Sequence, residues 1–307
     1  MARFGFGKEH SDYASAGFVV TNEDPEIHIK LLEKYIDPKK PPKKALSICS
    51  GGEVPIYVLL PVCKRVFAID HGARALAAAQ VKALWLSQWG PKRLQQFLKD
   101  CNQDDSYSNS TDSNFRKVME AVYPRISKVL RDSLQYKNHT TFRPFGYELN
   151  SIRSIWGAMD VDRLAAAKRR LGSLKFLLGD IAKDTKKFGL FDVIYASNCT
   201  EHSGRNGSPG LNDFEPLLKP GGLVLYTSGG FRFNHQGLYL SHVGPQAKPV
   251  SDIQTYLGCK FRVTHDWNLL ESSNSGSWKH SIARFNGTPT KYEEIGLGDN
   301  VIKPKAA

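Results

Sequence analysis

Two neighbouring side chains that titrate, Glu201 and His202, follow the apolar run 191–197. A carboxylate or an imidazole at this place can act as a general base, which a hydroxyl or a protonated amine needs before its lone pair can attack an electrophilic carbon. Asn198, between the run and this pair, can hold a cofactor or an acceptor through its side-chain amide. We therefore predict catalytic roles for Glu201 and His202. The alternative is that both are surface residues at the mouth of a cleft.

A second group of residues has the spacing of a site for an adenosine-containing cofactor. Ser50, Gly51 and Gly52 follow a short apolar run, and Asp70 ends the next one. Adjacent glycines allow a sharp turn close to a ligand, and a carboxylate about 20 residues later can accept hydrogen bonds from ribose hydroxyls. The turn lacks the third glycine of the dinucleotide fingerprint, which favours S-adenosylmethionine over NAD. An ordinary strand-turn-helix connection with a solvated Asp70 is the alternative.

The elements that must position these residues alternate between strands and helices. Apolar runs predict strands at 45–48, 66–69, 174–178, 191–197 and 223–227, and a final β-hairpin at 260–267 and 277–285. Helical patterns occupy 22–36, 54–60, 73–100 with a break at Gly90-Pro91, 115–136 and 150–171. The runs FDVIYAS and LLKPGGLVLY resemble those of class I S-adenosylmethionine-dependent methyltransferases. This resemblance implies a doubly wound, Rossmann-like α/β fold with a C-terminal antiparallel hairpin.

The same resemblance extends the predicted cofactor site. Asp180 and Ile181 follow the strand pattern at 174–178. In class I enzymes the acid at this position commonly contacts the adenine amine, which implies that role for Asp180 and a position against the adenine ring for Ile181. A helix N-cap is the alternative for Asp180, and one carboxylate can serve both purposes. His71, directly after Asp70, completes the predicted set.

The predicted second and third strands are separated by about a hundred residues, whereas a minimal crossover needs about a dozen. We therefore predict a helical insertion between them. The connection 229–245, after the fifth strand, is expected to line the acceptor pocket. The predicted organisation is an N-terminal segment with a helix at 1–44, a cofactor-binding domain formed by 45–72 and 173–287, the insertion at 73–172, and a tail at 288–307.

Residues 22–86 carry a more specific resemblance. Their order is Glu23-Asp24-Pro25, a short helix, a linker with prolines, Cys49-Ser50-Gly51-Gly52, Ala68-Ile69-Asp70, and a helix with Gln80 and Lys82. This order is similar to that of the betaine-lipid synthase family, whose members transfer the 3-amino-3-carboxypropyl group of S-adenosylmethionine to diacylglycerol. The resemblance implies the same group transfer. Glu53-Val54-Pro55 departs from the Asn-Ala-Leu that the family has after the turn.

Composition limits the class of protein. The net charge of the 307 residues is +12, which could serve an anionic membrane surface, a nucleic acid or solubility alone, and no nucleic-acid motif accompanies it. Five dispersed cysteines, with no secretory signal, predict reduced thiols in a cytoplasmic protein that could also be peripheral to a membrane. No apolar run reaches the length of a membrane span, about 18 residues. No metal is expected, since His235 and His242 lack a third ligand.

Three functions are compatible with these patterns. The family resemblance favours transfer of the aminocarboxypropyl group to a lipid, a small molecule or a nucleobase, or its cyclisation, with release of methylthioadenosine. Methyl transfer, which releases S-adenosylhomocysteine, is the first alternative. A non-catalytic cofactor-binding or RNA-binding protein is the second. The acceptor, the identity of any base and the oligomeric state are left open.

Overall fold

The computed structural model describes residues 24–100, 123–125, 149–181, 183–197, 211–229, 231–234, 237–241, 247–249, 261–265, 278–285 and 296–297. They fall into two compact units. The first lies within Cys49–Pro61 and Phe67–Asp180, and the second within Asn22–Ile48, Val62–Val66 and Ile181–Ala307.

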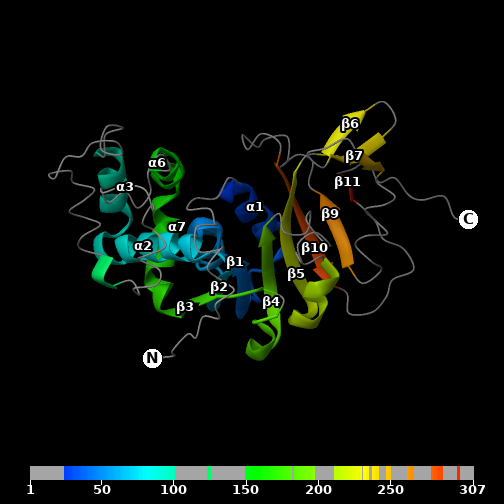
Figure 1. The fold of residues 1–307 in the computed structure, drawn as a ribbon, viewed down its shortest axis with the longest axis horizontal. Coiled ribbons are helices and arrows are strands. Elements are labelled where there is room, and N and C mark those ends of the chain that lie inside the picture. Colours follow the sequence, from blue (N-terminus) through cyan, green and yellow to red (C-terminus); the bar gives the residue numbers. More distant parts are fainter. Residues whose placement is uncertain are drawn as a thin grey trace, which may run out of the picture. The chain divides into compact units, whose positions relative to one another are not determined.

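Most strands of the main sheet belong to the second unit. They are β1 (Lys44–Ile48), β4 (Phe191–Ser197), β5 (Leu218–Gly229), β9 (Phe261–His265), β10 (Trp278–Phe285) and β11 (Gly296–Leu297). Parallel pairing joins β1 to β4 and β4 to β5. The next strand, β10, runs antiparallel between β5 and β9, as Figure 1 shows. This antiparallel β9 and β10 pair is the C-terminal hairpin predicted from the sequence.

The complete order of the sheet identifies the fold class. With β2 (Arg65–Asp70) and β3 (Leu174–Leu178) included, the order is β11-β9-β10-β5-β4-β1-β2-β3. The first five strands therefore follow the order 3-2-1-4-5 of a doubly wound sheet, in which ligands bind beyond the carboxyl ends of the strands where the order reverses. The predicted α/β fold with an antiparallel edge is confirmed. The reversal lies between β1 and β4.

The first unit contains a group of helices. They are α2 (Ala73–Trp89), α3 (Pro91–Asp100), α6 (Leu149–Ala158) and α7 (Val161–Arg170). Helix α3 contacts the other three, and Figure 1 shows the group together. The sequence predicts one helix over 150–171, but the structure has two, because the Asp160 side chain accepts a hydrogen bond from the Arg163 N–H at 2.7 Å and begins α7 anew.

Two short helical turns connect β1 to β2. They are the 3-10 turn η2 (Ser50–Gly52) and the π-helical turn η3 (Val54–Leu59). Every residue of η3 is buried. The predicted helix in this connection is therefore present, in a wider form than an α-helix. In the second unit, α1 (Pro25–Tyr35) begins where the acids and proline predict, with Asp24 as its N-cap.

The remaining elements are short. A second sheet consists of β6 (Phe231–Asn234), β7 (Gly237–Ser241) and β8 (Ala247–Pro249), within and just after the connection predicted to line the acceptor pocket. No periodicity predicted β11, which lies in the predicted tail. Turns of 3-10 helix occupy Tyr123–Arg125 (η5), Leu171–Ser173 (η7), Lys186–Phe188 (η8) and Leu211–Leu217 (η10). Of the helices in the described ranges, none has the length and apolar character needed to cross a membrane.

Candidate functional site

The turn after β1 has a backbone that only certain residues adopt. Ser50, Gly51 and Gly52 have φ angles of 40°, 85° and 105°. Left-handed angles of this kind cost glycine little and other residues more. A Cβ on Gly52 would also lie 2.7 Å from the Cβ of Ala79, on α2. The second glycine therefore allows the turn to pack directly against the following helix.

Asp70, the last residue of β2, is bound to this turn. Its side chain is 8% exposed. Its Oδ1 accepts a hydrogen bond from the Gly72 N–H at 2.8 Å, and its Oδ2 accepts one from the Ser50 N–H at 3.4 Å. An ionised carboxylate can accept about four hydrogen bonds. The carboxylate therefore has capacity for further donors beside the glycine turn.

Burial raises the pKa of the Asp70 carboxyl above its usual value. The hydrogen bond from Gly72 and the nearby imidazole of His71 act in the opposite direction but do not cancel the burial. A buried carboxylate without a full salt bridge is costly to a fold. The structure thus places an acid at this position at a cost in stability.

The other predicted cofactor residues differ in their surroundings. The Gly179 N–H donates to the Asp70 carbonyl at 2.9 Å, which brings Asp180 to the end of β2. The His71 side chain is 68% exposed, with its Nδ1 3.9 Å from Asp70 Oδ1. Ile181, in the second unit, is buried. Backbone bonds therefore gather the turn, Asp70 and Asp180 within the first unit, and their contacts with a cofactor remain predictions.

The predicted catalytic residues Glu201 and His202, and the predicted ligand-binding Asn198, lie outside the described residues. The residue before them, Ser197, ends β4 with a φ of 50°. Non-glycine residues with such angles occur mainly where the surrounding structure imposes them, often at functional sites. The backbone at the carboxyl end of β4 is therefore strained directly before the predicted catalytic segment.

Behind the glycine turn lies a buried ion pair. The side chains of Glu53 and Lys82 are both 0% exposed. The Lys82 Nζ donates to Glu53 Oε1 and also to the Gly51 carbonyl, the latter at 2.8 Å. Trp156 Nε1 donates to the same Glu53 oxygen at 2.8 Å. One lysine of α2 and one tryptophan of α6 therefore fix the acid that follows the turn, and the lysine also fixes the turn itself.

A second contact joins the insertion to η3. Arg163 donates from Nε to the Tyr57 carbonyl at 2.9 Å and from Nη2 to the Val58 carbonyl at 3.0 Å. The Tyr57 hydroxyl accepts a hydrogen bond from the Asp160 N–H at 2.8 Å. The last carbonyls of a helix have no partner inside it, and here an arginine from α7 supplies one. The predicted insertion thus supports the segment that follows the glycine turn.

Comparison with known proteins gives structural likeness and no sequence match. No protein-family model matches the chain, and no curated protein matches it. Among solved structures, the N-methyltransferase NodS from Bradyrhizobium japonicum WM9 has a TM-score of 0.39 and 16% identity, covering 85% of this chain and 93% of its own. The likeness is one of fold.

Two further solved structures are similar to the same extent. The rRNA methyltransferase aviRa from Streptomyces viridochromogenes has a TM-score of 0.37 at 12% identity, covering 90% of this chain and 93% of its own. A TehB-like S-adenosylmethionine-dependent methyltransferase from Corynebacterium glutamicum has a TM-score of 0.36 at 12% identity, covering 86% and 88%. Values this low carry no argument about the reaction of this chain. The resemblance of residues 22–86 to the betaine-lipid synthase family remains a prediction.

Sequence reasoning missed part of this site. It identified neither Trp156 nor Arg163, and it treated Glu53 only as a departure from a family pattern. The available signal was a single charge in each of two apolar stretches, Glu53 before VPIYVLL and Lys82 within the alanine-rich helix. A charge in a buried element requires a partner, so these two residues could have been paired from the sequence.

Metal binding and catalysis by cysteine find little support among the described residues near the turn. In the ranges with described side chains, no three His, Cys, Asp or Glu residues are grouped so as to hold a metal ion. Cys49 and Cys63 are buried. Burial raises the pKa of the Cys49 thiol, and the nearby Asp70 and Glu53 raise it further. Cys49 is therefore a neutral packing residue and a poor nucleophile.

Proposed function

We propose that this protein is an S-adenosylmethionine-dependent transferase. The observation that carries the proposal is the Asp70 carboxylate, buried at the end of β2 and joined by hydrogen bonds to Gly72 and to Ser50 of the glycine turn. An acid so placed can accept hydrogen bonds from the two ribose hydroxyls of an adenosine. The glycine turn would then lie under the amino acid part of the cofactor.

The cofactor supplies most of the chemistry in such a reaction, because its sulfonium makes each attached carbon electrophilic. The protein has to position the acceptor and provide a lone pair. In this proposal Asp180 contacts the adenine amine and Ile181 lies against the ring. Glu201 or His202 removes a proton from the acceptor, and Asn198 holds the acceptor or the cofactor.

Methyl transfer is the reaction we propose first. It is the commonest reaction among proteins of this fold, so this choice rests on analogy of fold. Aminocarboxypropyl transfer is the second candidate, favoured by the Cys49-Ser50-Gly51-Gly52 turn and its context in residues 22–86. A small molecule or a lipid is the proposed acceptor in both cases. A cytoplasmic protein that associates peripherally with membranes would suit a lipid.

The nucleoside product separates these reactions. The purified protein would be incubated with S-adenosylmethionine and a cell extract as acceptor source, and the product identified by mass spectrometry. S-adenosylhomocysteine above the rate of a heat-denatured control is expected. Methylthioadenosine would instead establish transfer or cyclisation of the aminocarboxypropyl group. Neither product, from a protein that binds the cofactor, would contradict the transferase proposal and favour a non-catalytic role.

A further inference from the structure

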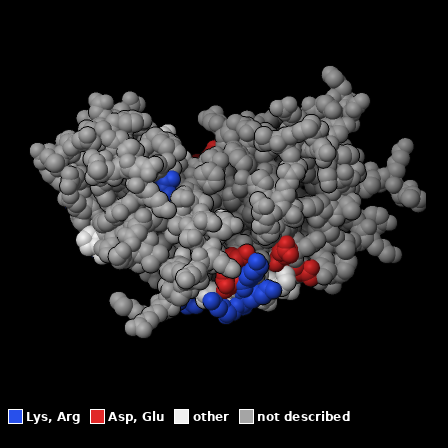
Figure 2. Space-filling view, in the orientation of Figure 1, with Lys and Arg blue, Asp and Glu red and all other residues white. Residues whose placement is uncertain are grey.

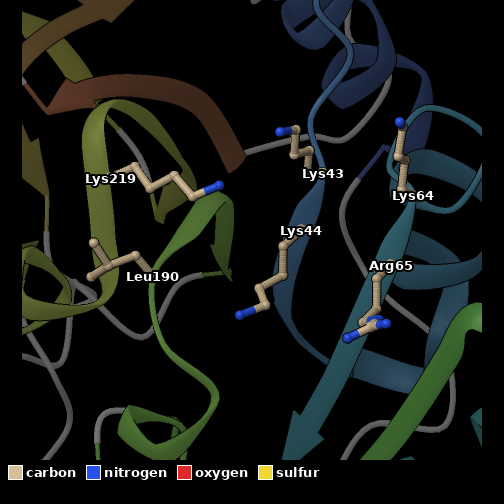
Figure 3. A pocket seen from close by; sticks show the side chains of 6 residues that line it. All are labelled: Lys43, Lys44, Lys64, Arg65, Leu190 and Lys219. Atoms are coloured by element: carbon tan, nitrogen blue, oxygen red, sulfur yellow. The ribbon is translucent and has the colours of Figure 1, made fainter.

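A basic pocket lies in the second unit. Its volume is about 390 Å³, and five cationic side chains and one leucine line it: Lys43, Lys44, Lys64, Arg65, Lys219 and Leu190. Figure 3 shows that these residues come from separate chain segments, with Lys44 and Arg65 extending toward the same side of the view and Lys219 reaching across from β5. The sequence offered no motif for this pocket, since its lysines fit a solvated linker equally well.

The topology explains why these cations meet. Lys44 begins β1 and Arg65 begins β2, while Leu190 directly precedes β4. The parallel strands β1, β4 and β5 have their amino ends at one edge of the sheet. The glycine turn follows the carboxyl end of β1 and belongs to the first unit, and none of its residues is among those that line the pocket. The pocket is therefore not part of the candidate cofactor site.

Among the described residues, Asp192 bonds to this cluster through both of its side-chain oxygens. Asp192 Oδ1 accepts a hydrogen bond from Lys219 Nζ at 2.7 Å. Its Oδ2 accepts from the backbone N–H groups of Lys43 at 3.1 Å and Lys44 at 2.8 Å. The Lys44 Nζ donates to the Phe188 carbonyl, which is a neutral acceptor. The cations that line the pocket thus exceed the negative charge supplied by Asp192.

The neighbouring positive charges affect Lys44. The pKa of Lys44 is lowered, first by burial and then by the like charges of Lys219 and Arg65, although Asp192 acts in the opposite direction. An anion between these side chains would relieve that repulsion. The free protein therefore holds cations together at a cost that a bound anion would offset.

We propose that this pocket binds a phosphate-bearing ligand with two or more negative charges. Phosphate oxygens accept hydrogen bonds from several donors at once, and Arg65 can bind two of them through its planar guanidinium. The volume falls in the range of small-ligand pockets, about 300–1,000 Å³. Leu190, 44% exposed, offers apolar contact to the body of the ligand. A free phosphorylated compound and a phospholipid headgroup share this chemistry.

Two observations favour a local phosphate site over a nucleic-acid surface. None of the described residues that line the pocket is aromatic, whereas proteins that bind single strands usually stack bases on aromatic rings. Figure 2 shows basic side chains gathered in a group with acidic side chains beside them. These acids would repel the phosphates of a long polyanion that extended beyond the basic group.

Tripolyphosphate tests the proposal directly. Isothermal titration calorimetry would compare the wild-type protein with two double variants of equal charge change: Lys64→Gln with Arg65→Gln, in the pocket, and Lys92→Gln with Arg93→Gln, an exposed pair on α3. Binding by the wild type and the α3 variant, with a dissociation constant at least tenfold higher in the pocket variant, is expected. No binding by the wild type, or equal weakening in both variants, would overturn the proposal.

A second arm identifies the source of the phosphate. Vesicles of phosphatidylcholine with phosphatidic acid would be sedimented with each protein, with and without free tripolyphosphate. If the wild-type protein sediments with the vesicles, and neither the pocket variant nor the wild type with tripolyphosphate does so, the ligand is a lipid headgroup. If the wild type does not sediment with the vesicles but binds tripolyphosphate in the calorimeter, the ligand is a soluble compound. The protein could instead bind a duplex RNA but no tripolyphosphate, with both double variants weakening the RNA binding equally. That result would overturn the pocket proposal in favour of a general polyanion-binding surface.

Discussion

Asp70 combines a proposed binding role with a cost to the fold. The carboxylate is buried beside the glycine turn, and burial raises its pKa. The backbone N–H groups of Ser50 and Gly72 and the exposed His71 lower this pKa, but they do not offset the burial. This arrangement suits a residue retained for a ligand.

The raised pKa predicts how Asp70→Asn changes stability with pH. The folded protein holds the Asp70 proton to a higher pH than the unfolded chain does, so this residue lowers the free energy of unfolding as the pH rises through its folded pKa. Asparagine does not ionise. The free energy of unfolding of Asp70→Asn should therefore exceed that of the wild type most at neutral pH, and this difference should shrink on acidification.

Urea denaturation at pH 7.5 and 5.0 measures this difference. The variant Asp162→Asn, at an exposed position on α7, controls for the loss of one negative charge. An advantage of Asp70→Asn that grows as the pH falls would contradict the account of Asp70.

At the scale of residues, the sequence predicts which side chains lie together where their separation along the chain determines their position. Ser50, Gly51, Gly52 and Asp70 could be grouped because glycine turns and strand ends have typical separations. Trp156 could not, because it reaches Glu53 across 103 residues of chain. Such a contact depends on how α6 packs, which local patterns do not encode.

At the scale of elements, the ion pair behind the turn connects η3, α2 and α6. Glu53 directly precedes η3 as its N-cap residue, Lys82 belongs to α2, and Trp156 belongs to α6. All three side chains are buried. The pair therefore couples the glycine turn to the predicted insertion, which gives these helices a structural role beside any role in acceptor choice.

Replacing one member of the pair should lower the free energy of unfolding more than expected from replacing both. Lys82→Met leaves the Glu53 carboxylate buried without its cation, and loss of one partner of a buried pair costs about 3–5 kcal/mol. The double variant Glu53→Gln with Lys82→Met should lose less than the sum of the single variants. Urea denaturation of the four proteins measures the coupling.

A matched control is Lys99→Met, because Lys99 is an exposed lysine on α3 and surface changes are usually within about 0.5 kcal/mol. Additive losses in the cycle would show that Glu53 and Lys82 do not stabilise each other.

Most elements could be predicted because their patterns are strong. The strands β1 to β5, β9 and β10 follow from apolar runs, and α1 from its capping residues. The π-helical form of η3 could not be predicted, since VPIYVLL has no distinguishing period. The helical pattern over 150–171 does not show the break between α6 and α7, which the Asp160 N-cap makes.

At the scale of the whole molecule, the two ends of β1 belong to different candidate sites. The carboxyl end continues into the glycine turn, and Lys44 at the amino end lines the basic pocket. Part of the net charge of +12 is therefore concentrated in this pocket, for which we propose a phosphate-bearing ligand. Composition alone could not locate it, because the cations come from segments far apart in the chain.

The measurement that tests the central claim is the affinity for S-adenosylmethionine, by isothermal titration calorimetry, of the wild type, Asp70→Asn and the control Asp162→Asn. A hydrogen bond to a charged group contributes about 1.5–3 kcal/mol. The wild type and Asp162→Asn should therefore bind alike, and Asp70→Asn should bind about tenfold more weakly or worse. Equal affinity of Asp70→Asn, or no binding by the wild type, would contradict the assignment of this turn and its acid as a cofactor site.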